Sequence, residues 1–241
     1  KLVCSGNKTK LLIVGTKDLR NSKLNNKVIK IKVAGHDVTE SESERLLGLT
    51  VNNTMTWEHH LYGNTEHRGL VSKLSQRAGL IRRLSRVMPM DRLTIMAEGI
   101  FFSLLNYCLE VFSNVWGLDT YDETSRHSTA FRKVDNLKLQ ILVNKVLRAL
   151  TGLDRETPTS VLSSRSGQLS VHQRTALFTV MSVHKVLKNK EPVYSHSRLK
   201  PVQEQDQPAR PQPNCKRVEC KLSISRGGFF YRGSRLYNQL P

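Results

Sequence analysis

The hydrophobic period of the chain changes near residue 57, and this change constrains the fold more than any other feature. Before it, apolar and polar side chains alternate, as in residues 28–33, which is typical of half-buried strands. From residue 57 to residue 190, apolar side chains recur every three or four positions, as in helices with one buried face. We therefore predict an α+β fold in which a small N-terminal antiparallel sheet of about three strands precedes a mostly α-helical bundle.

Three N-terminal segments have the length and composition of strands. They cover residues 10–15, 28–33 and 45–51. Residues 34–38, with the sequence Ala-Gly-His-Asp-Val, predict a tight turn into the return of the second strand as a hairpin. Three such strands cannot form a core alone, so helices or further strands must cover them.

Five helices are predicted from apolar spacing and capping residues. They cover residues 70–88, 91–116, 128–150, 157–166 and 170–190. Gly167 follows the fourth helix, and Ser170 with Gln173 fits a capping box that opens the fifth. The stripe of the fifth helix expected to face the core consists of Leu177, Met181, His184 and Leu187.

Residues 93–116 are the most apolar part of the chain. They include Glu98 and Glu110, which are costly in a bilayer, so a buried core helix is favoured over a membrane span. Binding of this segment to a membrane surface is a weaker alternative.

The periodic pattern ends after residue 190. Five of the eight prolines lie between residues 192 and 213, which predicts a linker over residues 191–215. Residues 216–241 form a basic tail with interleaved aromatic side chains and are expected to be partly disordered. Such a tail suits base stacking beside phosphate contacts, or docking on the core as a β-hairpin, and the second is favoured.

The charge of the chain favours a polyanionic partner. Lys and Arg number 38 against 20 Asp and Glu, which gives a net charge of +18 and a pI of about 10.1. Nucleic acid is the first candidate partner and an anionic membrane surface the second, while a merely soluble basic protein remains the plain alternative. Residues 68–86 hold six basic residues and no acidic one, whereas a solvated helix face normally mixes both signs.

The four cysteines are too few and too scattered for a disulfide framework. We expect free thiols in a reducing intracellular compartment, nucleus or cytoplasm. Cys215 and Cys220 have no second Cys or His pair at zinc-finger spacing, so no metal site is expected.

The sequence contains no self-contained catalytic site. It has no adjacent Asp-Asp pair, no glycine-rich phosphate loop, no GxSxG and no HExxH motif. A nucleic-acid-binding role therefore fits the residues better than an independent enzymatic activity.

Several short motifs follow one another along nearly the whole chain. They are Asn7-Lys8-Thr9-Lys10, Glu44-Arg45-Leu46-Leu47-Gly48-Leu49, Met55-Thr56-Trp57 with His60, Ser103-Leu104-Leu105-Asn106-Tyr107, Val115-Trp116, Ser166-Gly167-Gln168-Leu169-Ser170-Val171, Phe230-Tyr231-Arg232-Gly233 and Leu236-Tyr237-Asn238-Gln239-Leu240-Pro241. Their order and spacing resemble the C-terminal part of the reverse transcriptases of non-LTR (LINE-type) retrotransposons. In that family the last motif usually has Trp where this chain has Tyr237.

The resemblance implies a division of the chain and a function. Residues 1–56 would be the end of the palm with primer-grip strands, and residues 57–190 the thumb and connection bundle. The fingers and most of the palm, with the metal-binding aspartates, would precede Lys1 in the same polyprotein. The chain would then be a fragment of an RNA-directed DNA polymerase, inactive alone, with Mg²⁺ expected only for the complete enzyme and no cofactor in this chain.

The resemblance also implies site residues. Lys8 would lie near the phosphates of the incoming nucleotide, and Leu47 with Gly48 would support the 3′ end of the primer. A thumb holds the template–primer duplex by its backbone, which requires cations and no sequence readout. The candidates for this contact are Arg68, Lys73, Arg77, Arg82, Arg83 and Arg86.

A second interpretation requires no polymerase. The chain would then be a non-enzymatic, basic, helical nucleic-acid-binding module, such as a domesticated or decayed remnant of a mobile element. Both interpretations share the basic helix, and they differ in what is encoded upstream of Lys1.

Overall fold

The computed structural model describes residues 5, 8–15, 22, 29–54, 56–113, 133–199, 215, 218 and 228–240. They belong to two compact units, Lys1–Ser72 and Lys73–Pro241, each of which is described by itself. The strands lie in the first unit as two antiparallel hairpins, and the second unit is helical. The predicted α+β class is therefore confirmed.

The first hairpin has the predicted turn. β1 (Lys30–Val33) pairs with β2 (His36–Thr39), and Ala34 and Gly35 connect them with φ angles of 49° and 83°. Positive φ at both central residues is the requirement of a type I′ turn, whose twist matches that of paired strands.

A second hairpin replaces the single strand predicted over residues 45–51. β3 (Ser43–Leu46) pairs with β4 (Leu49–Asn52), and Leu47 and Gly48 form the turn with φ angles of 47° and 87°. The prediction was wrong because Leu47 is apolar and is not a usual turn residue, so the turn is hidden within an apolar run.

Residues 10–15 do not form the predicted strand. Leu11 makes one isolated parallel bridge to Glu40, and the amide of Gly15 donates to the carbonyl of Asn53 at 2.9 Å. These separate bonds tie the segment to the hairpins without continuing a ladder.

A short helix completes the first unit. α2 (Glu58–Tyr62) packs on β4, and His60 Nδ1 accepts the backbone amide of Thr50 at 3.4 Å. The side-chain oxygen of Asn52 accepts the amide of Thr56 at 2.7 Å, which fixes the chain just before the helix. The start of the helical segment expected at residue 57 thus lies within the first unit.

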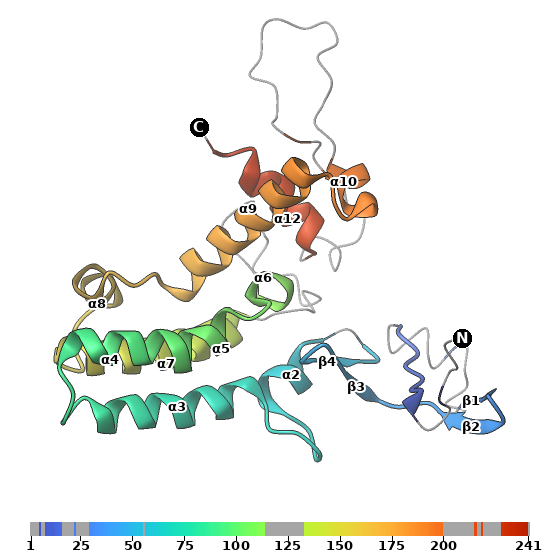
Figure 1. The fold of residues 1–241 in the computed structure, drawn as a ribbon, viewed down its shortest axis with the longest axis horizontal. Helices are drawn as coiled ribbons and strands as arrows, with labels where there is room; N and C mark the ends of the chain where they lie inside the picture. The colour runs from blue at the N-terminus through green and yellow to red at the C-terminus, as the bar shows by residue number, and fades with distance from the viewer. Residues whose placement is uncertain are drawn as a thin grey trace, which may run out of the picture. The chain divides into compact units, whose positions relative to one another are not determined.

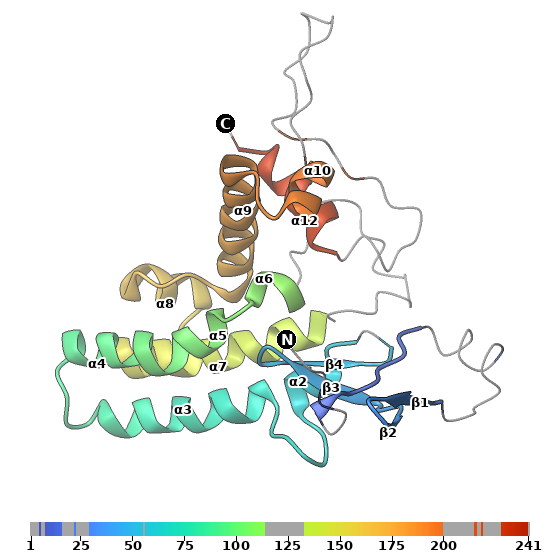
Figure 2. The ribbon, with the colours of Figure 1, turned by 45° about the vertical axis from the view of Figure 1, so that its right-hand side comes forward.

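The second unit is built on a rod of three consecutive helices. α4 (Met90–Ala97), a π-helical turn η2 (Glu98–Phe102) and α5 (Ser103–Asn106) run end to end. α3 (Leu70–Leu84) and α7 (Lys133–Thr151) lie alongside this rod in both views (Figures 1 and 2).

The helix predicted over residues 91–116 is interrupted at Cys108. This residue is left-handed (φ 54°, ψ 27°), and α6 (Leu109–Phe112) begins after it, while residues 114–116 lie outside the described residues. The segment Met90–Phe112 is long and apolar enough to cross a membrane, a test that core helices also pass. Six of its large side chains are fully buried, namely Leu93, Phe101, Phe102, Leu105, Leu109 and Phe112, whereas Ile95, Tyr107 and Val111 are exposed, and 33% of the apolar window is buried.

The two helices around Gly167 confirm the predicted caps. α8 (Thr159–Ser166) ends at Gly167, which is left-handed with φ of 65°. α9 (Val171–Asn189) begins with the capping box, in which Ser170 Oγ accepts the Gln173 amide at 3.2 Å and Gln173 Oε1 accepts the Ser170 amide at 2.9 Å.

The predicted inner face of α9 is wrong. Leu177, Met181 and His184 are exposed, and Leu187 is half-buried. The buried positions are Val171, Arg174, Thr175, Thr179, Val183 and Val186. Apart from Arg174, this face has smaller side chains than the predicted one, and the C-terminal helix lies close against its Thr179 and Val183, as described next.

The basic tail contributes a docked helix. α12 (Phe229–Tyr237) packs on α9 and on α10 (Val193–Leu199). A Cβ at Gly233 would lie 2.6 Å from Cγ2 of Val183, so a side chain there would separate the two helices. Docking on the core is therefore correct, but the expected β-hairpin is a helix over the described residues 228–240. α10 occupies part of the expected linker, of which residues 200–214 lie outside the described residues.

Candidate nucleic-acid interface

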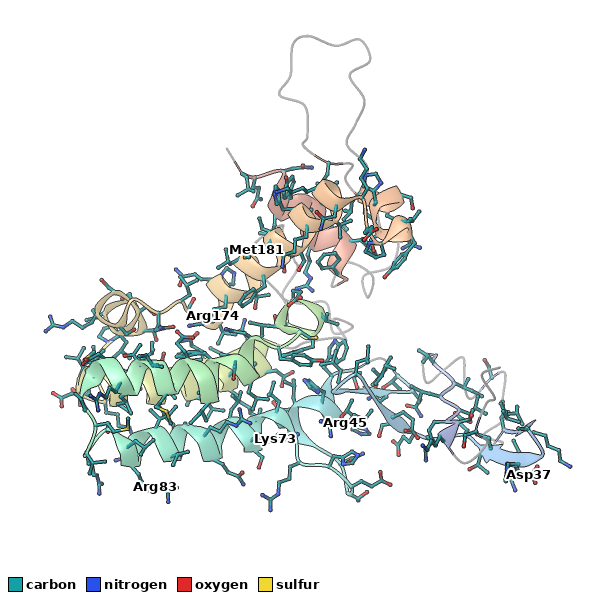
Figure 3. All side chains as sticks on the ribbon, in the orientation of Figure 1. Asp37, Arg45, Lys73, Arg83, Arg174 and Met181 are labelled. Carbon is teal, nitrogen blue, oxygen red and sulfur yellow. The ribbon has the colours of Figure 1, made fainter. Side chains whose placement is uncertain are left out.

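α3 has one apolar face and one polar face. Leu74, Ala78 and Ile81 are almost completely buried in the second unit, as the helical spacing predicted. Besides Ser72 and Val87, the exposed positions of the helix and the turn after it recur at the same spacing: Ser75, Gln76, Gly79, Arg82, Arg83 and Arg86. We call these six residues the α3 outer face. Figure 3 shows Arg83 on the side of α3 that points away from α4 and α7.

All charged side chains of the α3 outer face are positive. Arg82, Arg83 and Arg86 are exposed, Lys73 at its edge is half-buried, and α3 itself contains no acidic residue. Two of these cations lie in the last turn of α3, where they also interact favourably with the negative end of the helix dipole. That stabilisation needs only one or two cations, so the helix dipole does not account for the whole group.

Arg77, another of the predicted cations, makes a contact inside the second unit. Its side chain is half-buried, and its Nη1 donates to the carbonyl oxygen of Ile100 in η2. In a π-helical turn the carbonyl groups do not follow the hydrogen-bond pattern of a regular α-helix, and the guanidinium of Arg77 donates to one of these carbonyls. Arg77 therefore contributes to the attachment of α3 to the rod.

η2 is also held from its other side by Arg174 of α9. The guanidinium of Arg174 lies 4.2 Å from the centroid of the Phe102 ring, and its Nη1 donates to Asn106 Oδ1 at 3.3 Å. Gln168 Oε1 accepts from Nη2, and Gln168 Nε2 donates to Glu98 Oε1 at 2.7 Å. Burial lowers the pKa of Arg174, and the charge of Glu98 opposes that effect.

Sequence reasoning missed Ser75, Gln76 and Gly79 on the α3 outer face. An added Cβ at Gly79 would meet no atom within 4 Å, so no contact inside the chain requires a glycine there. A glycine inside an exposed helix costs about 1 kcal/mol relative to alanine. The signal that could have found it is its position three residues before Arg82, on the same helical face.

The remaining predicted site residues lie in the first unit. Arg68 is exposed at the end of a loop that closes on Gly63 and Gly69, where a Cβ on Gly69 would lie 2.4 Å from the Leu61 carbonyl oxygen. Lys8 is exposed in a single turn, in which its amide donates to the carbonyl of Ser5 at 3.1 Å.

Leu47 and Gly48 form the tip of the β3–β4 hairpin. The Leu47 side chain is 83% exposed and its backbone is left-handed, a conformation that costs a non-glycine residue about 1–2 kcal/mol. A bulky apolar residue in this conformation at an exposed tip is unusual and marks the turn as a candidate contact.

Residues of the later motifs serve as contacts between distant segments. Arg232 donates to the carbonyl oxygens of Glu110 and Ser113, and Asn238 exchanges two 2.8 Å hydrogen bonds with the backbone of Cys215. The motif residues Asn106 and Gln168 both bind Arg174. These motifs therefore position helices of the second unit.

Cys215 is a free cysteine in the interior of the second unit. Its side chain is fully buried, burial raises the pKa of its thiol to about 11, and Sγ lies 3.7 Å from the Ser234 carbonyl oxygen. Cys220 lies outside the described residues. Within the ranges that the structure describes, no cluster of three or more His, Cys, Asp or Glu side chains could hold a metal ion.

Comparisons with protein-family models, with curated proteins and with solved structures give no match to this chain. The case for the site therefore rests on the geometry of its own residues.

Proposed function

We propose that the second unit holds a nucleic-acid duplex by its phosphate backbone through the α3 outer face. The observation that carries this proposal is the row of three exposed arginines formed by Arg82 and Arg83 in the last turn of α3 and Arg86 in the turn after it, with no acidic residue in α3. Such a row matches the spaced negative charges of a duplex and requires no particular base sequence.

The small residues of the same face support close approach. Ser75 and Gln76 can donate hydrogen bonds to phosphate oxygens, and Gly79 leaves the helix backbone uncovered. An RNA–DNA hybrid, which is near A-form, has a wide and shallow minor groove that a helix can follow by its shape.

We further propose that this duplex is the template–primer of an RNA-directed DNA polymerase from a mobile element, with this chain as its thumb and connection region. The ordered motifs support this proposal. Leu47 and Gly48 would then contact the primer end, Lys8 would lie on the phosphate side of the nucleotide, and Mg²⁺ would be held by palm residues of the same polyprotein outside this chain.

The alternative, a non-enzymatic nucleic-acid-binding module, is favoured by one observation. Arg232, Asn238 and Gln168 all find partners within the chain, so the described helices of the second unit satisfy these motif residues without another protein segment. Both candidates require the same α3 outer face.

Titration of the full chain with a labelled DNA duplex at several salt concentrations tests the backbone contact. Four cations, Lys73, Arg82, Arg83 and Arg86, predict a slope of log affinity against log salt of about −3.6. Replacing the three arginines by glutamine should reduce the slope by about 2.7 and weaken an RNA–DNA hybrid in parallel.

A charge-matched control has K145Q, R155Q and R165Q, three exposed cations away from α3. It should leave duplex binding unchanged. Equal losses in both triple variants would reject the α3 outer face as the site.

The polymerase context has its own test. The reading frame upstream of Lys1 should encode an aromatic-Ala-Asp-Asp hairpin, whereas a start codon close to Lys1 would favour the independent module. Primer extension by this chain alone with Mg²⁺ should be absent, and its presence would contradict the proposal.

A further inference from the structure

A second surface with a cation and exposed aromatic groups lies where α10 meets α12. The Tyr194 side chain is 66% exposed, and its ring lies edge-on to the Phe230 ring with centroids 6.4 Å apart and planes at 78°. The guanidinium of Arg198, one turn after Tyr194 on α10, lies 5.3 Å from the centroid of the same Phe230 ring. We call these three residues the Tyr194 cluster.

The cluster rests on a firm base. Phe230 packs edge-on against Phe229 at 5.5 Å, and both rings lie against the buried side chains Val183, Val186 and Leu199. Tyr194 is the outermost ring of this edge-on group, and much of its surface remains exposed to solvent.

The segments that carry the cluster have charges of almost a single sign. Between residues 184 and 199 the basic residues are Lys185, Lys188, Lys190 and Arg198, and all of them are exposed. The only acidic residue in that stretch is Glu191, and residues 228–240 contain none. A surface built only for docking α12 would require neither the exposed ring nor this excess of cations.

We infer that the Tyr194 cluster binds an unpaired nucleic-acid strand. A base stacks on the exposed ring of Tyr194, and Arg198 with the neighbouring lysines neutralises the adjacent phosphates. Stacking of this kind accepts any base, because every base has a flat π-face, and a nearby guanidinium strengthens it. A duplex, whose bases are already stacked on one another, offers no free face to Tyr194.

This inference concerns a different surface and a different ligand state from those of the α3 outer face. One set of measurements can therefore test the duplex proposal and the single-strand inference independently. The full chain is titrated with a labelled single-stranded oligo-dT 20-mer and with a labelled duplex, using Y194A, Y194F and the triple glutamine variant of the arginines on α3.

Y194A should weaken oligo-dT binding about tenfold, within the range found for the loss of one stacked base, and leave duplex binding within about twofold. Y194F should retain most of the affinity because the ring remains. Y107A removes another exposed tyrosine, at the turn after α5, and should have no effect on either ligand.

A covalent readout locates the contact directly. Ultraviolet cross-linking of a 5-bromodeoxyuridine oligonucleotide should mark the tryptic peptide of residues 191–198, which contains Tyr194. The mark should disappear from this peptide in Y194A.

Three results would overturn the inference. The first is that Y194A binds oligo-dT as the wild type does. The second is that Y194A loses affinity for oligo-dT and for the duplex equally. The third is that Y194A loses binding to phosphatidylserine vesicles but keeps its oligo-dT binding. The last would assign the surface to a membrane. If instead the duplex fails to bind the wild-type chain while oligo-dT binding depends on Tyr194, the duplex proposal fails and this inference stands.

Discussion

Arg232 of α12 donates a hydrogen bond from Nη1 to the backbone carbonyl oxygen of Ser113, 119 residues earlier in the chain. Its Nη2 donates to the carbonyl of Glu110 at 2.9 Å, so one guanidinium satisfies two carbonyls at the end of α6. Only 3% of the Arg232 surface is exposed, and burial lowers the pKa of its side chain to about 10, against the opposing charge of Glu110. The buried guanidinium therefore links α12 to the end of α6.

R232A should lower the free energy of unfolding by about 3 kcal/mol. It leaves two carbonyls near the end of α6 without their donor, each worth about 1–3 kcal/mol, while removal of a buried charge returns part of that loss. Urea denaturation measures the effect. R165A, at an exposed arginine of α8, should change stability by less than about 0.5 kcal/mol. Similar values for the two variants would show that the Arg232 contacts do not hold the tail.

G233A should destabilise the second unit by about 1–3 kcal/mol. The new methyl group would lie 2.6 Å from Val183 Cγ2, which is inside van der Waals contact, and would push α12 away from α9. Shortening the opposing side chain should relieve this overlap, so the double variant G233A/V183A should be more stable than the sum of the single effects predicts. Strict additivity in this double-mutant cycle would contradict the close approach.

G79A should increase stability and decrease binding. Alanine in an exposed helix is favoured over glycine by about 0.5–1 kcal/mol, and nothing within 4 Å opposes the methyl group. If the helix backbone approaches a duplex at Gly79, the same methyl group should weaken duplex binding by about tenfold, equivalent to about 1.4 kcal/mol. Thermal melting and anisotropy titration report the two effects.

G99A is the matched control, because Gly99 is also exposed in the helical rod and has open space around it. It should stabilise the chain without altering duplex binding. Unchanged binding in G79A would exclude close approach at that position.

L47N should stabilise the β3–β4 hairpin by about 1 kcal/mol. Leu47 has a positive φ, which asparagine tolerates much better than leucine. Hydrogen exchange of the β3 and β4 amides measures the change. L46N makes the same chemical change at the neighbouring exposed leucine, which pairs with Leu49 at the end of β3, and it should not stabilise the hairpin. Protection that is equal in the two variants would refute backbone strain at Leu47.

The stability of the second unit should fall between pH 9 and pH 11 because of Cys215. Burial raises the pKa of this thiol from 9.0 to about 11, so in this window the unfolded chain loses the proton first and unfolding is favoured. The loss reaches at most about 2.7 kcal/mol for two pKa units. Urea denaturation at pH 8 and pH 11 under reducing conditions should show it in the wild type, and C215S should remove the contribution of Cys215 and leave that of Cys108, whose thiol pKa is also raised by burial. The same pH dependence in C215S would assign it to other groups.

Local features were predicted well where one or two residues decide the geometry. The turn at Ala34–Gly35, the capping box at Ser170 and the end of α8 at Gly167 were all identified from residue type. The reason is that positive φ and free helix-end amides restrict which residues can be present, independently of the rest of the fold.

The prediction of the buried face of α9 failed because that face depends on the helix that packs against it. The apolar stripe of α9 containing Leu177 and Met181 is exposed, as Met181 in Figure 3 illustrates, and the face with Arg174 and Thr179 is buried. Hydrophobicity alone predicts that the face of α9 with the larger apolar side chains is the buried one. The close approach of Gly233 requires the smaller ones, and this requirement exists only once α12 is in place.

By itself, the sequence determined the α+β class, the buried stripe of α3 and the cluster of cations on the other side of that helix, because each depends on residue spacing and composition along one element. Only the tertiary structure decided which cations remain exposed. Arg77 donates to the carbonyl of Ile100. Arg174 is buried against η2, and Arg232 is buried against the end of α6. Arg82, Arg83 and Arg86 remain exposed. The difference arises because burial of a guanidinium depends on which carbonyls and rings the fold brings to it, and those come from segments far away in the chain.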